Sequence, residues 1–99
     1  MKITIHKKIA AYFGYEFTRI SNSIYQNQTR HTIALIEQHD IDLVIDVGAN
    51  MGQFATDLRK SGYAGQIVSF EPLKECYQHL QSITDDKWHV ENIALGSED

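Results

Sequence analysis

Apolar residues in the second half of the chain form short runs that alternate with helical patterns. The first run, Leu43–Val47, is rich in β-branched residues and carries one carboxylate, Asp46. A run of this kind is typical of a central parallel strand that is buried on both faces. The same reasoning predicts further strands over Gln66–Glu71 and Trp88–Ala94.

Two helical patterns lie between these strands. One covers Gln53–Lys60 and directs Phe54, Ala55 and Leu58 inward, and the other begins at Pro72, a residue preferred at the first helical position. Strand–helix–strand units with short loops imply parallel strands and right-handed crossovers. We therefore predict an α/β fold with three parallel strands in the order 3-2-1 and the first strand at one edge.

Residues 1–40 are expected to form a separate helical segment in front of a half-domain that covers residues 41–99. Helical spacing of Ile5, Ile9, Tyr12 and Phe13 predicts a short amphipathic helix over residues 3–13. A polar, irregular stretch follows over residues 15–28, and a second helix is predicted over Thr29–Gln38.

Composition excludes several classes of function. The 99 residues carry a net charge of −4 without a block of like charges, which argues against a general affinity for nucleic acid. One cysteine, Cys76, excludes an internal disulfide and fits a reducing compartment. No apolar run approaches the ~20 residues of a membrane span, so we expect a cytoplasmic protein.

Candidate chemistry gathers where the predicted strands end. A tight turn from Gly48 to Gly52 follows the first strand at once, and Glu71 ends the second strand 19 positions after Gly52. An acidic residue ~20 positions beyond a glycine turn is where the ribose hydroxyls of a nucleoside cofactor are held. Each feature alone is more often structural, and their combination at this spacing favours a cofactor site.

The glycine spacing discriminates between cofactors. A dinucleotide fingerprint starting at Gly48 requires glycines where the chain has Asn50 and Gln53, whereas a G-x-G-x-G turn has two of its three glycines. The second form suits a ligand without pyrophosphate, and nearby Asp46 favours a cationic group. These residues favour S-adenosyl-L-methionine (SAM) over NAD.

The motif D-V-G-A-N-M-G at Asp46–Gly52, followed by F-E-P at Phe70–Pro72 and A-L-G at Ala94–Gly96, resembles the FkbM family of SAM-dependent methyltransferases. The similarity covers about residues 41–96. It implies part of a Rossmann-like, three-layer class I methyltransferase fold. It also implies O-methylation of a small-molecule or glycan hydroxyl.

The resemblance also implies roles for individual residues. Asp46 and the turn residues Gly48, Ala49, Asn50 and Gly52 are expected to hold the methionine part of SAM. Glu71, followed by Pro72, is expected to bind the ribose, and Ala94 and Leu95 to border the adenine. No catalytic base is identified.

Two alternatives remain open at this point: half of an NAD-binding oxidoreductase, and a non-catalytic interaction module that keeps the fold. The sequence offers no strand for the outer edge of Leu43–Val47. Because an uncovered apolar edge pairs readily with another chain, we expect self-association there.

Overall fold

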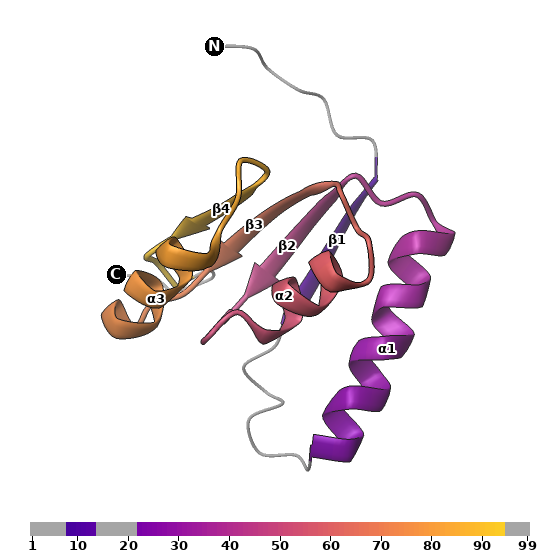
Figure 1. Cartoon of the computed structure of the whole chain (residues 1–99), viewed down its shortest axis with the longest axis horizontal. Coiled ribbons are helices and arrows are strands. Elements are labelled where there is room, and N and C mark those ends of the chain that lie inside the picture. The colour runs from indigo at the N-terminus through magenta and orange to yellow at the C-terminus, as the bar shows by residue number, and fades with distance from the viewer. Residues whose placement is uncertain (1–7, 14–21, 95–99) are drawn as a thin grey trace.

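The computed structural model describes residues 8–13 and 22–94, without the side chains of residues 13 and 22–28. Strands and helices alternate along the whole of this part of the chain (Figure 1). The elements are β1 (Ile9–Phe13), α1 (Asn22–Gln38), β2 (Leu43–Val47), α2 (Gln53–Lys60), β3 (Gln66–Phe70), α3 (Lys74–Ile83) and β4 (Trp88–Glu91).

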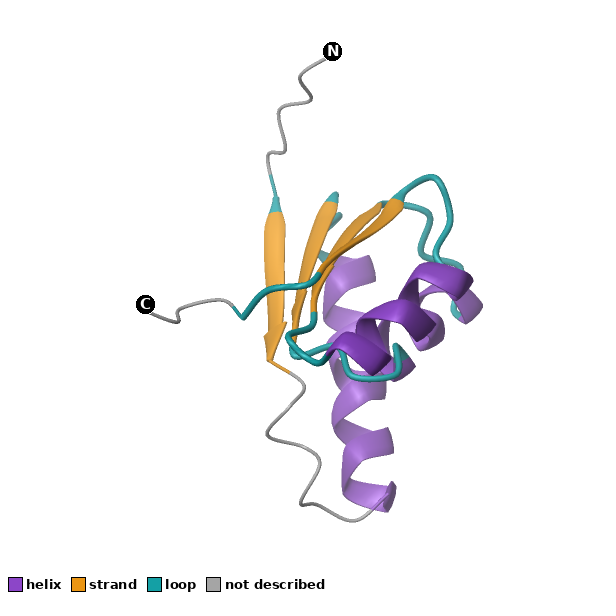
Figure 2. Ribbon diagram, turned by 90° about the vertical axis from the view of Figure 1, so that its left-hand side faces the viewer, coloured by secondary structure: helices purple, strands orange, loops and turns teal. Residues whose placement is uncertain are grey.

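The four strands form one parallel sheet in the order β1-β2-β3-β4. Each crossover therefore steps in the same direction across the sheet. Since crossovers between parallel strands are right-handed, all the helices are expected on one face. Figure 2 shows α1, α2 and α3 on the same side of the sheet. The expected three-layer arrangement is therefore wrong for the described residues, which form two layers.

The first strand of the sheet corrects a prediction. Ile9–Phe13 is a strand that pairs with β2 from Ile9↔Leu43 to Phe13↔Val47, where the sequence pattern predicted a helix. Periodicity alone does not distinguish a strand from a helix in a short apolar run. Strand pairing decides the conformation of Ile9–Phe13. Without this segment one edge of β2 would have unpaired backbone groups, and only another extended segment can pair with them.

This strand also removes the predicted open edge at Leu43–Val47. That segment pairs with β1 on one side and β3 on the other, so the predicted edge position and self-association through it are wrong. The bounds predicted for this strand and for the helix Gln53–Lys60 are confirmed. The helix predicted over Thr29–Gln38 begins earlier, at Asn22, within the stretch expected to be irregular. The predicted helical residues 3–7 lie outside the described residues.

The core lies between the sheet and the helices. Every second residue of β2, β3 and β4 points to the helical layer, where Val44, Ile67 and Trp88 are buried. α2 contributes Phe54, Ala55 and Leu58, as predicted, and α3 contributes Leu80. The ring of Tyr12 stacks on Phe54 with centroids 3.7 Å apart, which ties β1 to α2.

No helix in the described part of the chain is both long and apolar enough to cross a membrane.

Candidate functional site

The register of the sheet brings the predicted site segments to one edge. Val47, Phe70 and Glu91 are neighbours in register at the carboxyl ends of β2, β3 and β4. The glycine turn, Glu71 and Asn92 therefore start side by side. Two backbone bonds continue the ladder there: Gly48 N–H donates to Phe70 O over 2.9 Å, and Glu71 N–H donates to Glu91 O over 3.0 Å.

The backbone conformation of the glycine turn accounts for the residue types found there. Gly48, Asn50 and Gly52 have φ angles of 71°, 55° and 85°, in the left-handed region. Glycine adopts this region without strain, and asparagine tolerates it better than most residues. A Cβ atom on Gly52 would also lie 2.8 Å from Leu80 Cδ2. The turn therefore has structural reasons for its sequence, independent of any ligand.

Glu71 connects the turn to the start of α3. Its Oε1 accepts from the backbone N–H of Asn50 at 2.6 Å, and its Oε2 accepts from the backbone N–H of Leu73 at 2.9 Å. Only 4% of the residue is exposed. The structure thus brings Asn50 and Glu71 together as the sequence spacing predicted, with the carboxylate engaged by the protein's own backbone.

Asp46 lies on the helical face of β2 and is 1% exposed. Its Oδ2 accepts from the Ser69 hydroxyl at 3.3 Å, while among the described residues its buried Oδ1 has no hydrogen-bond partner. Burial raises the pKa of Asp46 to about 7; the Ser69 hydrogen bond lowers this pKa, and the charge of Glu71 raises it further. A buried carboxyl with one unused oxygen is an acceptor for a donor that a ligand can supply.

Two of the residues predicted at the adenine or beside Glu71 are on the surface. Ala94 and Pro72 are exposed, and Leu95 lies outside the described residues. β4 ends at Glu91, so the prediction that this strand extends to Ala94 is wrong. The side chain of Asn92 ends the ladder, because its Nδ2 donates to the carbonyl oxygens of Glu71 at 2.9 Å and Pro72 at 3.1 Å.

Sequence reasoning missed three polar contributors to this edge: Ser69, Cys76 and Asn92. The Cys76 thiol donates to Asn50 Oδ1 at 3.3 Å, and desolvation, followed by the charges of Glu71 and Glu75, raises its pKa. It therefore stays a thiol and supports the asparagine of the turn. The signal for Ser69 was in the sequence, since it is the polar residue at an inward position of an apolar strand.

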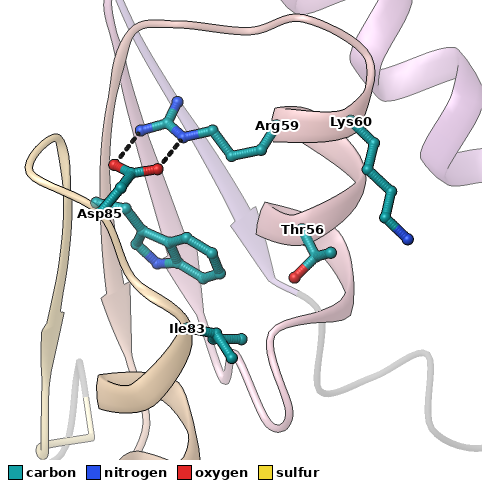
Figure 3. Close-up of a pocket in the computed structure, with 6 residues that line it drawn as sticks. Thr56, Arg59, Lys60, Ile83 and Asp85 are labelled. Atoms are coloured by element: carbon teal, nitrogen blue, oxygen red, sulfur yellow. Dashed lines mark hydrogen bonds and ion pairs between the residues drawn. The ribbon is translucent and has the colours of Figure 1, made fainter.

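A cavity of about 380 Å³ lies between α2, the end of α3 and the start of β4 (Figure 3). Its walls contain none of the predicted site residues; they are formed by Thr56, Arg59, Lys60, Ile83, Asp85 and Trp88. Ile83 and Trp88 also border the glycine turn, since a Cβ on Gly52 would lie 2.9 Å from Ile83 Cδ1 and 3.5 Å from Trp88 Cη2.

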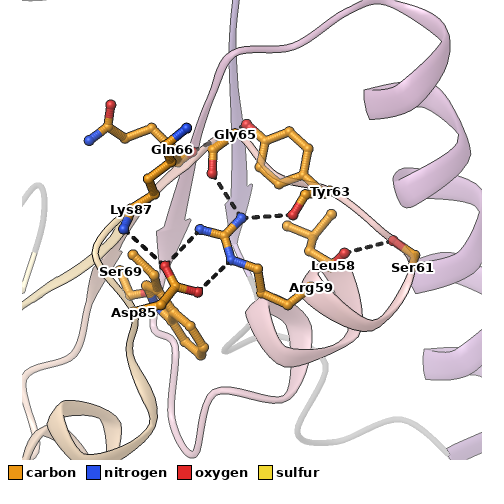
Figure 4. Close-up of polar contacts among 10 residues, drawn as sticks. Leu58, Arg59, Ser61, Tyr63, Gly65, Gln66, Ser69, Asp85 and Lys87 are labelled. Carbon is orange, nitrogen blue, oxygen red and sulfur yellow. Dashed lines mark hydrogen bonds and ion pairs between the residues drawn. The ribbon is translucent and has the colours of Figure 1, made fainter.

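Arg59, in the wall of this cavity, has a structural role. Its guanidinium forms a two-point contact with Asp85 over 2.8 Å and 3.1 Å, and Nη1 donates to the carbonyl oxygens of Tyr63 and Gly65, both at 2.8 Å (Figure 4). These contacts use both edges of the planar group. Arg59 therefore joins α2 to the loop before β3 and to the turn before β4, and is not available as an anion ligand.

No protein-family model, curated protein or solved structure matches the chain. Indications of function therefore come from the side chains at the carboxyl edge. Asp46 Oδ1 needs a donor, and the carboxylate of Glu71 accepts one bond on each oxygen where each can accept about two. These acceptors fit a ligand with an ammonium group and paired hydroxyls, and the residues present therefore fit SAM.

Proposed function

We propose that this chain carries the cofactor-binding part of a SAM-dependent methyltransferase that methylates a hydroxyl group of a small molecule or glycan. The observation that supports this most directly is the 2.6 Å hydrogen bond from Asn50 N–H to Glu71 Oε1. It joins the glycine turn to the acidic residue that follows the next strand. Parallel sheets bind ligands beyond the carboxyl ends of their strands, which is where these residues lie.

The residues have distinct roles in this proposal. Asp46 accepts from the ammonium group through Oδ1, and Glu71 accepts from the ribose hydroxyls through its remaining lone pairs. The bound cofactor supplies a methyl group on a sulfonium centre. The chain contributes binding and orientation, which account for much of the catalysis of a displacement reaction. The general base, if the acceptor needs one, is not among the residues assigned here.

Asn50 argues against the oxidoreductase alternative. In a dinucleotide site this position is a glycine, so that the backbone can approach the pyrophosphate. Here the Asn50 side chain is held by the Cys76 thiol, and its backbone N–H is already bound to Glu71. The backbone N–H is the group that a pyrophosphate would need, and the side chain occupies the position that such a site leaves empty.

Titration calorimetry on the full chain with SAM and, separately, with NAD tests the proposal. We expect heat of binding with SAM and none with NAD. Binding of NAD alone would favour the oxidoreductase alternative, and the absence of binding to both would contradict the proposed function.

One observation favours a non-catalytic interaction module as the second candidate. Asp46 and Glu71 are 1% and 4% exposed, so both acceptors are closed to solvent in this structure. A module that keeps the fold would use the two carboxyls only as internal contacts. It would remain folded and would not bind SAM, which the same calorimetry detects.

A further inference from the structure

A chain of hydrogen bonds crosses three strands behind the candidate site. Trp88 Nε1–H donates to Ser69 Oγ at 2.9 Å, and the Ser69 hydroxyl donates to Asp46 Oδ2 at 3.3 Å. All three side chains are buried, with Ser69 fully enclosed. Asp46 and Ser69 are direct register partners, and Trp88 reaches Ser69 diagonally from its position opposite Ile67.

The direction of these hydrogen bonds is determined by the groups that form them. An indole N–H can only donate, and a serine hydroxyl has a single hydrogen to donate. Because Ser69 Oγ accepts from Trp88, its hydrogen is left for Asp46 Oδ2. These hydrogen bonds therefore hold Asp46 by Oδ2 and leave Oδ1 without a partner among the described residues.

The surroundings of Asp46 offer little else that could hold it. Tyr12 on β1 is its register partner, and Glu71, after β3, adds a negative charge. α2 contributes the apolar residues Phe54, Ala55 and Leu58 to the core over this face, and α3 contributes Leu80 and the half-buried Tyr77. Ser69 is therefore the hydrogen-bond donor to Asp46 that the structure defines.

We propose that Ser69 and Trp88 are positioning residues that fix the side chain of Asp46 through Oδ2, so that Oδ1 is presented to a cationic group of the ligand. The role of Oδ1 rests on the proposed function, whereas the positioning by Ser69 and Trp88 can be tested without ligand. Loss of a hydrogen bond to a charged group reduces binding by about one decade or more. We therefore expect Ser69→Ala to weaken SAM binding by about tenfold.

The protein contains one tryptophan, Trp88, so its emission reports directly on this chain of contacts. A pH titration of the emission of ligand-free protein should show a transition as Asp46 ionises. Asp46→Asn should abolish it. Ser69→Ala should move it to higher pH and reduce its amplitude, because the hydroxyl that favours the ionised carboxyl is gone. Ser69→Thr, which keeps a hydroxyl, should restore it.

Ser61→Ala is the matched control, since the Ser61 hydroxyl donates to Leu58 O at the end of α2 and takes no part in these contacts. Equal transitions in Ser69→Ala and the wild type would overturn the positioning role. With saturating SAM, we expect the wild-type transition to move to lower pH, because a cationic partner favours the ionised form.

Calorimetry separates the two ways in which the ligand experiment can fail. Binding of SAM that leaves the emission transition unmoved would overturn the role of Oδ1 and leave the proposed function intact. If SAM does not bind, the proposed function fails together with the ligand role of Oδ1. The ligand-free titration then still decides whether Ser69 and Trp88 position Asp46.

Discussion

The backbone N–H of Asn50 donates to the carboxylate of Glu71 over 2.6 Å, across 21 positions of sequence. The same carboxylate accepts from Leu73 N–H at 2.9 Å. One buried side chain thus holds the turn after β2 against the start of α3. Any ligand that uses Glu71 binds to a carboxylate that the protein has already oriented, which limits the entropy lost on binding.

Replacing Glu71 should affect stability and ligand binding together. Glu71→Ala leaves two backbone N–H groups without a charged acceptor, and a hydrogen bond to a charged group contributes about 1.5–3 kcal/mol. We expect a loss of this order in the free energy of unfolding, measured with urea. SAM affinity should fall by about one to two decades. Glu75→Ala, at an exposed position in the first turn of α3, is the control and should change both quantities little.

Unchanged SAM affinity in a folded Glu71→Ala variant would remove Glu71 from the binding site.

Gly52→Ala should destabilise the protein through backbone strain and through overpacking. Comparison with Gly62→Ala separates these two effects. At Gly52 φ is 85° and a new Cβ would lie 2.8 Å from Leu80 Cδ2, whereas at Gly62 φ is 101° and nothing lies within 4 Å. A left-handed conformation costs a non-glycine residue about 1–2 kcal/mol, and overpacking adds about 1–3 kcal/mol. Thermal unfolding should therefore show a larger loss for Gly52→Ala than for Gly62→Ala. Equal losses would mean that contact with α3 does not constrain this position.

Asp46 should make stability depend on pH. The pKa of its carboxyl is 3.8 in an unperturbed chain and about 7 in the folded protein. Between these values the folded state binds more protons than the unfolded state, so stability falls as pH rises. The slope approaches ~1.4 kcal/mol per pH unit. Above the folded pKa the contribution is constant.

Urea unfolding of the wild type and Asp46→Asn between pH 4 and pH 8 measures this contribution. The variant should lack the decline with pH. Asp85, whose pKa is lowered chiefly by its hydrogen bond with Arg59, makes stability rise with pH instead of fall. Its effect lies below its unperturbed pKa of 3.8, outside the range measured. Parallel curves for the two proteins would show that Asp46 is ionised throughout.

Arg59 should be sensitive even to a conservative replacement. Lysine keeps the charge at this position but not the planar fork that contacts Asp85, Tyr63 O and Gly65 O together. We expect Arg59→Lys to lower the free energy of unfolding by about 1–3 kcal/mol, since partly buried carbonyl groups lose their donor. Lys60→Ala, at the exposed neighbouring position, should be close to neutral. Similar unfolding midpoints for the two variants would contradict the structural role assigned to Arg59.

The amino-acid sequence by itself determined the elements that carry strong local signals. The apolar run Leu43–Val47 and the helix Gln53–Lys60 have the bounds that their patterns predict. The spacing from Gly52 to Glu71 was enough to place the turn and the carboxylate at one edge, because parallel strands joined by short crossovers end together. These properties depend on residues close in sequence and on rules that hold for every parallel sheet.

Other properties were decided only by the tertiary structure. Ile9–Phe13 satisfies a helical pattern, yet it is a strand because the edge of β2 pairs with it. The identity of Asp46 does not reveal that it is buried and held by Ser69, since this requires β3 and β4 to lie beside β2 in one register. Asn92 ends β4 through contacts with residues about twenty positions away. Each of these outcomes depends on pairing or burial between distant segments, which local patterns do not encode.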